Sequence, residues 1–140
     1  MVNLIGQQMG NVSQYDKAKY LLETGCAIIV FRKKSGELRT MLCTRNFNTA
    51  TLFDFDARIN SRTNAKLSPD NVVVTDLIIG ETRQILLSNV MWSAWFSIPT
   101  TKDDVDTLIR AFNYVKDSWS NYDELSPIYQ DGFKKSFALS

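Results

Sequence analysis

The stretch CAIIVFRKKSGELRTMLCTR, residues 26–45, decides the fold class. Its first part, 26–32, is rich in β-branched and aromatic residues, which is typical of a buried strand. A polar turn, KKSG at 33–36, ends in a glycine that suits the left-handed backbone of many hairpin turns. From 37 to 45, apolar and polar side chains alternate over most of the length. The stretch therefore predicts a β-hairpin.

Three more strands are expected further along the chain. Residues 72–87 have the pattern of a second hairpin, and 90–98 read as a fifth strand that Pro99 ends. Five short antiparallel strands rarely remain flat, because they close into a small barrel or pack a helix on one face. The sequence therefore predicts a mainly β fold, a small five-stranded antiparallel barrel over 26–98.

Helices are expected on both sides of this barrel. Residues 13–24 predict an N-terminal helix. Residues 101–119 predict a C-terminal amphipathic helix, which Thr100 or Thr101 caps. The tail 120–140 is aromatic, and we expect it to pack on the domain or on a partner.

The remaining segments carry weaker patterns. Gly25 is expected to end the first helix, and the residues before Asn11 are expected to be loosely attached. The period-two pattern at 53–58 suits a short strand, whereas 60–71 reads as a long loop.

Composition limits the function classes. The chain fits one domain, 1–140, and its net charge of +1 gives no global attraction to nucleic acid or membrane. The lack of histidine removes the commonest general base and metal ligand. Cys26 and Cys43 are expected to be buried, reduced thiols, near each other across the hairpin. We expect no enzyme activity, no catalytic residue, no metal and no cofactor, and a cytoplasmic protein without a signal peptide or membrane span.

The first hairpin also resembles a known family. FRKKSGELRTMLCT, Phe31 to Thr44, contains Phe-x-Lys-Lys-x-Gly followed by Arg-x-Met-x-Cys-Thr. VTDLIIGETRQILLSNV, Val74 to Val90, follows with a Val-x-Asp hairpin that carries an Arg. These motifs are similar to those of a phage-encoded WYL-like family with an Sm-like, Src-homology-3-like barrel.

The resemblance covers about residues 18–96 and implies more about fold than about function. It implies a large-genome tailed bacteriophage as the source, and a role in host takeover or regulation inside the host cytoplasm. Thr82 stands where the family usually has Trp, and the Trp-Tyr-Leu tripeptide of the wider WYL group is absent. The ligand recognition that this tripeptide supports is therefore not carried over.

Basic residues along the barrel predict contact with nucleic acid. Small barrels bind nucleic acid with Lys and Arg on the phosphates and aromatic rings on the bases. The candidates lie at the hairpin tip, on the following strand and in the long loop: Arg32, Lys33, Lys34, Arg39, Arg45, Arg58 and Arg62. An ordinary solvated turn is the alternative. The first hypothesis is a non-enzymatic phage regulatory protein that binds nucleic acid, directly or within a host transcription or nucleoid complex.

Aromatic residues predict a protein-binding surface. Trp92, Trp95 and Phe96 alternate imperfectly, so at least one is expected to point away from the core. The candidates are Trp92, Trp95, Trp119, Tyr122, Tyr129 and Phe133. Closure of the barrel by the C-terminal helix is the alternative. The second hypothesis is an inhibitor or adaptor that acts on a host enzyme or defence factor, with a barrel that stays folded without 121–140. A third is a homo-oligomer that holds a small nucleotide signal between protomers.

Overall fold

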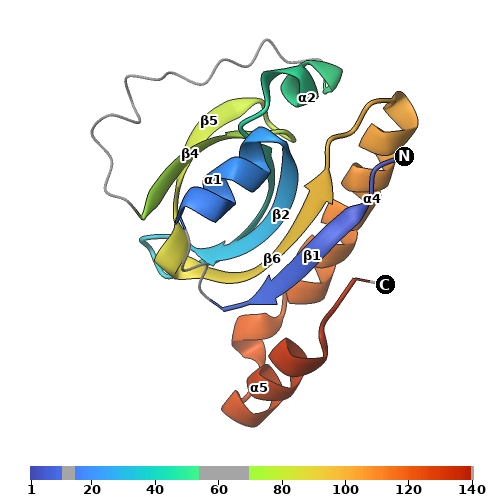
Figure 1. The fold of residues 1–140 in the computed structure, drawn as a ribbon. Coiled ribbons are helices and arrows are strands. Elements are labelled where there is room, and N and C mark those ends of the chain that lie inside the picture. The colour runs from blue at the N-terminus through green and yellow to red at the C-terminus, as the bar shows by residue number, and fades with distance from the viewer. Residues whose placement is uncertain (11–14, 54–69, 140) are drawn as a thin grey trace.

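A computed structural model describes residues 1–10, 15–53 and 70–139, and within them one six-stranded antiparallel sheet curves around helix α1 (Figure 1). The strand order is β1-β6-β2-β3-β4-β5. The strands are β1 (Leu4–Met9), β2 (Gly25–Arg32), β3 (Leu38–Thr44), β4 (Asn71–Asp76), β5 (Glu81–Leu86) and β6 (Val90–Ser97).

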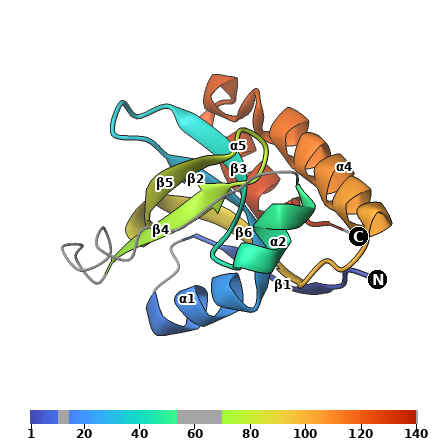
Figure 2. The same cartoon turned by 90° about the horizontal axis from the view of Figure 1, so that it is seen from above.

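Helices cover both sides of this sheet, and Figure 2 shows α1 and α4 on opposite sides. The N-cap Thr101 accepts a hydrogen bond from the backbone N–H of Asp104 at 3.2 Å, which fixes the start of α4. The helices are α1 (Tyr15–Glu23), α2 (Phe47–Leu52), α4 (Lys102–Trp119) and α5 (Pro127–Ser136), with 3₁₀ turns η1 (Leu87–Asn89) and η2 (Tyr122–Glu124).

Two hydrophobic cores follow from this layering. The inner core, on the α1 side, joins Leu22 to strand residues such as Ile29 and Trp95. The outer core, on the α4 side, joins residues such as Ile28 to Leu108 of α4. Successive residues of a strand point to opposite faces, so a strand covered on both faces is a continuous apolar run. This explains the CAIIVF sequence of β2.

The five predicted strands are all present, and the structure adds a sixth. The expectation of a loosely attached N-terminus is wrong, because β1 pairs with β6 from Leu4 opposite Phe96 to Met9 opposite Trp92. Closure into a barrel is not confirmed, since the sheet is open with β1 and β5 at its edges. The small fold of sheet and helices is therefore confirmed, whereas its five-stranded barrel form is not.

Strand β1 and the residues before it also make hydrogen bonds with α4 and with the C-terminal segment. The backbone N–H of Val2 donates to Asp104 at 2.9 Å. The Gln7 amide donates to the carbonyl of Leu139 at 3.0 Å and accepts from its N–H at 2.8 Å. The N-terminal segment thus contacts both α4 and the C-terminal end of the chain. A local sequence pattern cannot reveal such distant contacts.

Other boundaries differ in detail from the sequence predictions. Gly25 begins β2 instead of ending α1, and a Cβ there would lie 2.1 Å from the carbonyl oxygen of Phe96. Glycine is required at this position by the close approach of β6. Phe53 follows helix α2 instead of opening a strand, and 54–58 lie outside the described residues. The tail is ordered as η2 and α5.

Candidate functional site

Arg32, the first predicted phosphate contact, forms an intramolecular salt bridge with Asp123. Its guanidinium donates to both carboxylate oxygens of Asp123 in η2, at 2.7 and 3.0 Å, and to the carbonyl of Gly36 at 2.8 Å. The hydrogen bond to Asp123 raises the pKa of Arg32 and lowers the pKa of Asp123. This salt bridge joins the β2–β3 hairpin to the C-terminal region, so the guanidinium of Arg32 already has acceptors within the chain.

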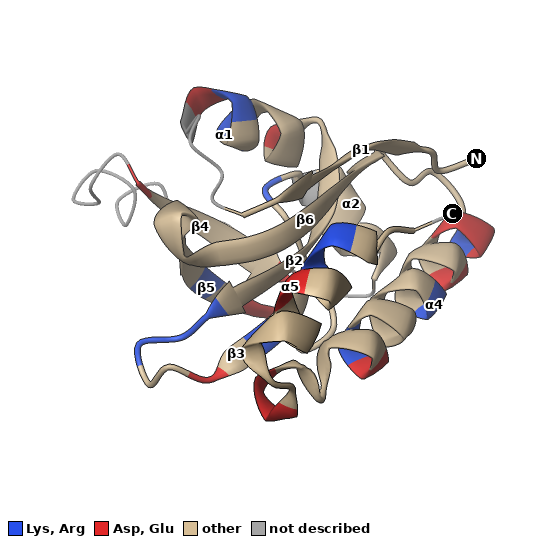
Figure 3. Cartoon of the chain, turned by 90° about the horizontal axis from the view of Figure 1, so that it is seen from below, with Lys and Arg blue, Asp and Glu red and all other residues tan. Residues whose placement is uncertain are grey.

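The remaining basic candidates that the structure describes do not form one surface. Lys33 pairs with Glu37 at 3.6 Å and Arg39 pairs with Asp76 at 3.6 Å. Arg45 is half-buried, pairs with Glu23 and donates to the carbonyl of Val73. Lys34 is exposed at the hairpin tip, whereas Arg58 and Arg62 lie outside the described residues. Figure 3 shows positive residues spread over the hairpin tip and several helices, with negative residues among them.

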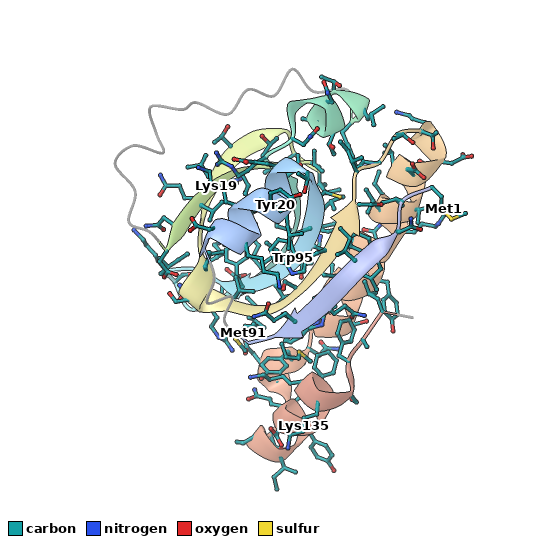
Figure 4. The ribbon with its side chains drawn as sticks, in the orientation of Figure 1. Met1, Lys19, Tyr20, Met91, Trp95 and Lys135 are labelled. Atoms are coloured by element: carbon teal, nitrogen blue, oxygen red, sulfur yellow. The ribbon has the colours of Figure 1, made fainter. Side chains whose placement is uncertain are left out.

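Four of the six aromatic candidates are core residues. Trp92 belongs to the outer core and Trp95 to the inner core, where Figure 4 shows it on the α1 side. The expectation that one of them points away from the core is wrong, because both sheet faces are covered. Trp119 and Tyr122 are also buried. These four residues have no exposed surface to offer a partner.

The aromatic tail completes the outer core. Phe133 packs edge-on against Trp119, with ring centres 4.8 Å apart. Phe137 packs edge-on against Trp92 at 5.0 Å and lies 5.3 Å from Phe133. Tyr122 contacts Trp119 at 5.0 Å. This packing does not support the expectation that the fold would survive removal of 121–140, since that deletion would uncover two tryptophans.

Tyr129 differs from the other candidates because it is exposed. Its side chain is 70% exposed and that of its neighbour Ile128 is 83% exposed. Both follow Pro127 in the first turn of α5, whereas Phe133 lies on the side of this helix that packs on Trp119. Helix α5 extends beyond the sheet, as Figure 1 shows, and Lys135 marks this helix in Figure 4. The apolar pair Ile128–Tyr129 is therefore presented to solvent by a fixed helix.

Sequence reasoning included Tyr129 among the candidates but not Ile128. The available signal was the Ser-Pro-Ile-Tyr start of a short helix. A proline in the first turn is favourable and fixes where the helix begins, so the helical register of the next residues could have been read from it.

A pocket of about 420 Å³ lies between β3, α4 and the turn after β4, and is called the β3–α4 pocket below. It arises because β3 pairs with β4 only through Cys43–Asp76 and Thr44–Thr75, which leaves the first half of β3 separated from the β4–β5 hairpin. Its walls combine charged and apolar side chains: Arg39, Asp76, Ile79, Phe112, Lys116 and Trp119.

The two cysteines lie on neighbouring strands, as expected, but on opposite faces of the sheet. Cys26 pairs with Thr44 and Cys43 with Ala27, so Cys26 enters the outer core and Cys43 the inner core. Burial raises the pKa of Cys26 to about 12 and raises that of Cys43 as well. Both thiols are free and fully buried. Their placement excludes a disulfide between them in this fold.

The described residues hold neither a metal-binding cluster nor a membrane-spanning helix. They contain no group of three or more Cys, Asp or Glu side chains placed to hold a metal ion. None of the helices in this part of the chain has the length and apolar character needed to cross a bilayer. No family model, curated protein or solved structure matches the chain.

Proposed function

We propose that this chain is a non-enzymatic bacteriophage protein that binds a host protein in the host cytoplasm through the exposed face of α5. The observation that carries the proposal is the pair Ile128 and Tyr129, 83% and 70% exposed on adjacent positions of one helix. Large apolar side chains that stay in water are favourable anchors for a partner, and tyrosine is enriched at such hot spots.

The packing of α5 supports this role. Phe133 and Phe137 hold the helix against Trp119 and Trp92. An anchor on a fixed helix loses less conformational entropy on binding than one on a flexible tail. The partner surface would be an apolar one that covers both Ile128 and Tyr129 in the first turn of α5.

Nucleic-acid binding receives less support from the geometry. Of the basic residues that the structure describes, Arg32, Lys33 and Arg45 each pair with an acidic side chain. A phosphate would have to compete with those carboxylates, and a +1 protein gains little from long-range attraction. Nucleic acid is therefore the competing outcome of the experiment below.

The experiment is affinity capture of the tagged protein from host lysate, with half of the sample treated with nuclease. A double variant, Ile128→Asp with Tyr129→Ser, removes the proposed anchor. Tyr20→Ser is the matched control, because Tyr20 is 64% exposed on α1, away from α5. Mass spectrometry and the absorbance ratio of nucleic acid to protein are the readouts.

The proposal requires one host protein that survives digestion, is lost from the α5 double variant and is retained by the Tyr20→Ser control. Capture that disappears with nuclease, and that is weakened by Lys33→Glu with Lys34→Glu, would overturn it in favour of nucleic acid. Equal capture by all variants would also overturn it, because the bound protein would then use another surface.

A further inference from the structure

We propose that the β3–α4 pocket binds a small organic anion, a carboxylate or phosphate group carried on a flat apolar body. The pocket volume of about 420 Å³ lies within the range of small-molecule sites, roughly 300–1,000 Å³. The site is separate from the exposed face of α5 and serves a ligand class that the protein-binding function does not require.

Two cations on the pocket wall have donors to spare. Lys116 is exposed on α4 and has no ion pair within the described residues. Arg39 approaches Asp76 through one terminal nitrogen at 3.6 Å, which is longer than a hydrogen bond. A guanidinium has five N–H donors in a planar fork that matches carboxylate and phosphate. Arg39 therefore retains donors for a ligand anion.

The carboxylates on the wall do not reverse this balance, because each already has a cation beside it. Asp76 also accepts hydrogen bonds from the backbone N–H groups of Ile78 and Ile79, at 2.9 and 3.3 Å. The three pairs are Glu37 with Lys33, Asp76 with Arg39, and Asp123 with Arg32. When each carboxylate is counted together with its paired cation, the remaining net charge of the pocket wall is the positive charge of Lys116.

The apolar part of the pocket fits a flat body. Phe112 and Trp119 of α4 line one side, and Ile78 and Ile79 of the β4–β5 turn line the other. Both isoleucines are exposed, at 40% and 45%. The indole N–H of Trp119 is a buried donor with no acceptor among the described residues. A ring held against Ile78 and Ile79 would cover apolar surface that now faces water.

The test is NMR titration of the labelled full chain with phenyl phosphate, benzoate and the neutral analogue benzyl alcohol, each at millimolar concentrations. The Trp119 indole signal and the amides of β3 are the reporters. We expect a saturable shift at these signals with one or both anions and a much smaller one with benzyl alcohol. Response to one anion alone identifies the group as phosphate or carboxylate.

Variants make the assignment specific. Lys116→Gln and Arg39→Gln should each weaken anion binding about tenfold, the factor for one charge-assisted hydrogen bond of modest strength. Arg110→Gln is the matched control, because Arg110 is an exposed cation of α4 outside the pocket wall and should leave binding unchanged. No saturable shift, equal binding of benzyl alcohol, or anion binding unaffected by both pocket variants would overturn the proposal.

Discussion

Replacing Phe133 with alanine should destabilise the whole domain, because its ring closes the outer core over Trp119. The ring centres of Phe133 and Trp119 are 4.8 Å apart, and Phe133 also stacks on Phe137 at 5.3 Å. A Phe→Ala change at a fully buried site costs about 3–5 kcal/mol. Phe133 is only partly buried, so we expect about 2 kcal/mol. For a domain of this size that corresponds to a fall in Tm of about 8 °C.

Urea unfolding, followed by tryptophan fluorescence and far-UV circular dichroism, measures this loss. Tyr129→Ala is the matched control on the same helix, because the side chain of Tyr129 is 70% exposed. The free energy of unfolding of this variant should stay within about 0.5 kcal/mol of the parent value. A loss below about 0.5 kcal/mol for Phe133→Ala would refute the reasoning, since α5 would then contribute no more than a surface segment.

Three further outcomes are expected. Cys26 and Cys43 should react with a thiol reagent only on unfolding, because burial raises both pKa values, that of Cys26 to about 12; rapid labelling of the native protein would contradict this. Gly25→Ala should cost more than 2 kcal/mol, by roughly the scale of core overpacking, because the new Cβ meets the backbone oxygen of Phe96; unchanged urea midpoints would count against it. Hydrogen bonds from backbone N–H groups lower the pKa of Asp104 in the folded protein. The stabilisation of the fold by this carboxylate is therefore present above the unfolded pKa of about 4 and is lost as pH falls through the lower folded pKa. Asp104→Asn should flatten the acid side of the plot of unfolding free energy against pH.

Local patterns were sufficient for the central sheet. The β2–β3 hairpin was readable because both strands and their turn are contiguous, and the turn glycine, Gly36, has a positive φ of 89° as its position requires. Helix α4 was readable because its apolar residues recur at helical spacing and Thr101 caps it. In each case the deciding interactions lie within a few turns or one hairpin.

Strand β1 was not readable for the opposite reason. LIGQQM has no alternation of apolar and polar residues and is mostly exposed. It becomes a strand because β6 offers it an edge, and because Val2 and Gln7 are hydrogen-bonded to Asp104 and Leu139. Such pairing depends on residues far away in the chain, so tertiary context and not local propensity decides it.

The candidate site shows the same limit for charge. Arg32 looked like a free cation at a hairpin tip, but its partner Asp123 is 91 positions away. The tryptophans looked like surface candidates because a single sequence does not show that both sheet faces are covered. Exposure and pairing of a polar or aromatic side chain are properties of the assembled layers, which explains why the site differed more from expectation than the strands did.

Site-specific photo-crosslinking tests whether α5 presents a protein-binding anchor. The crosslinker p-benzoylphenylalanine is placed at Tyr129 in one protein and at Tyr20, on α1, in another, and both are irradiated in nuclease-treated host lysate. We expect one discrete protein adduct from position 129 and no adduct of that mass from position 20. No adduct from position 129, or the same adducts from both positions, would contradict it.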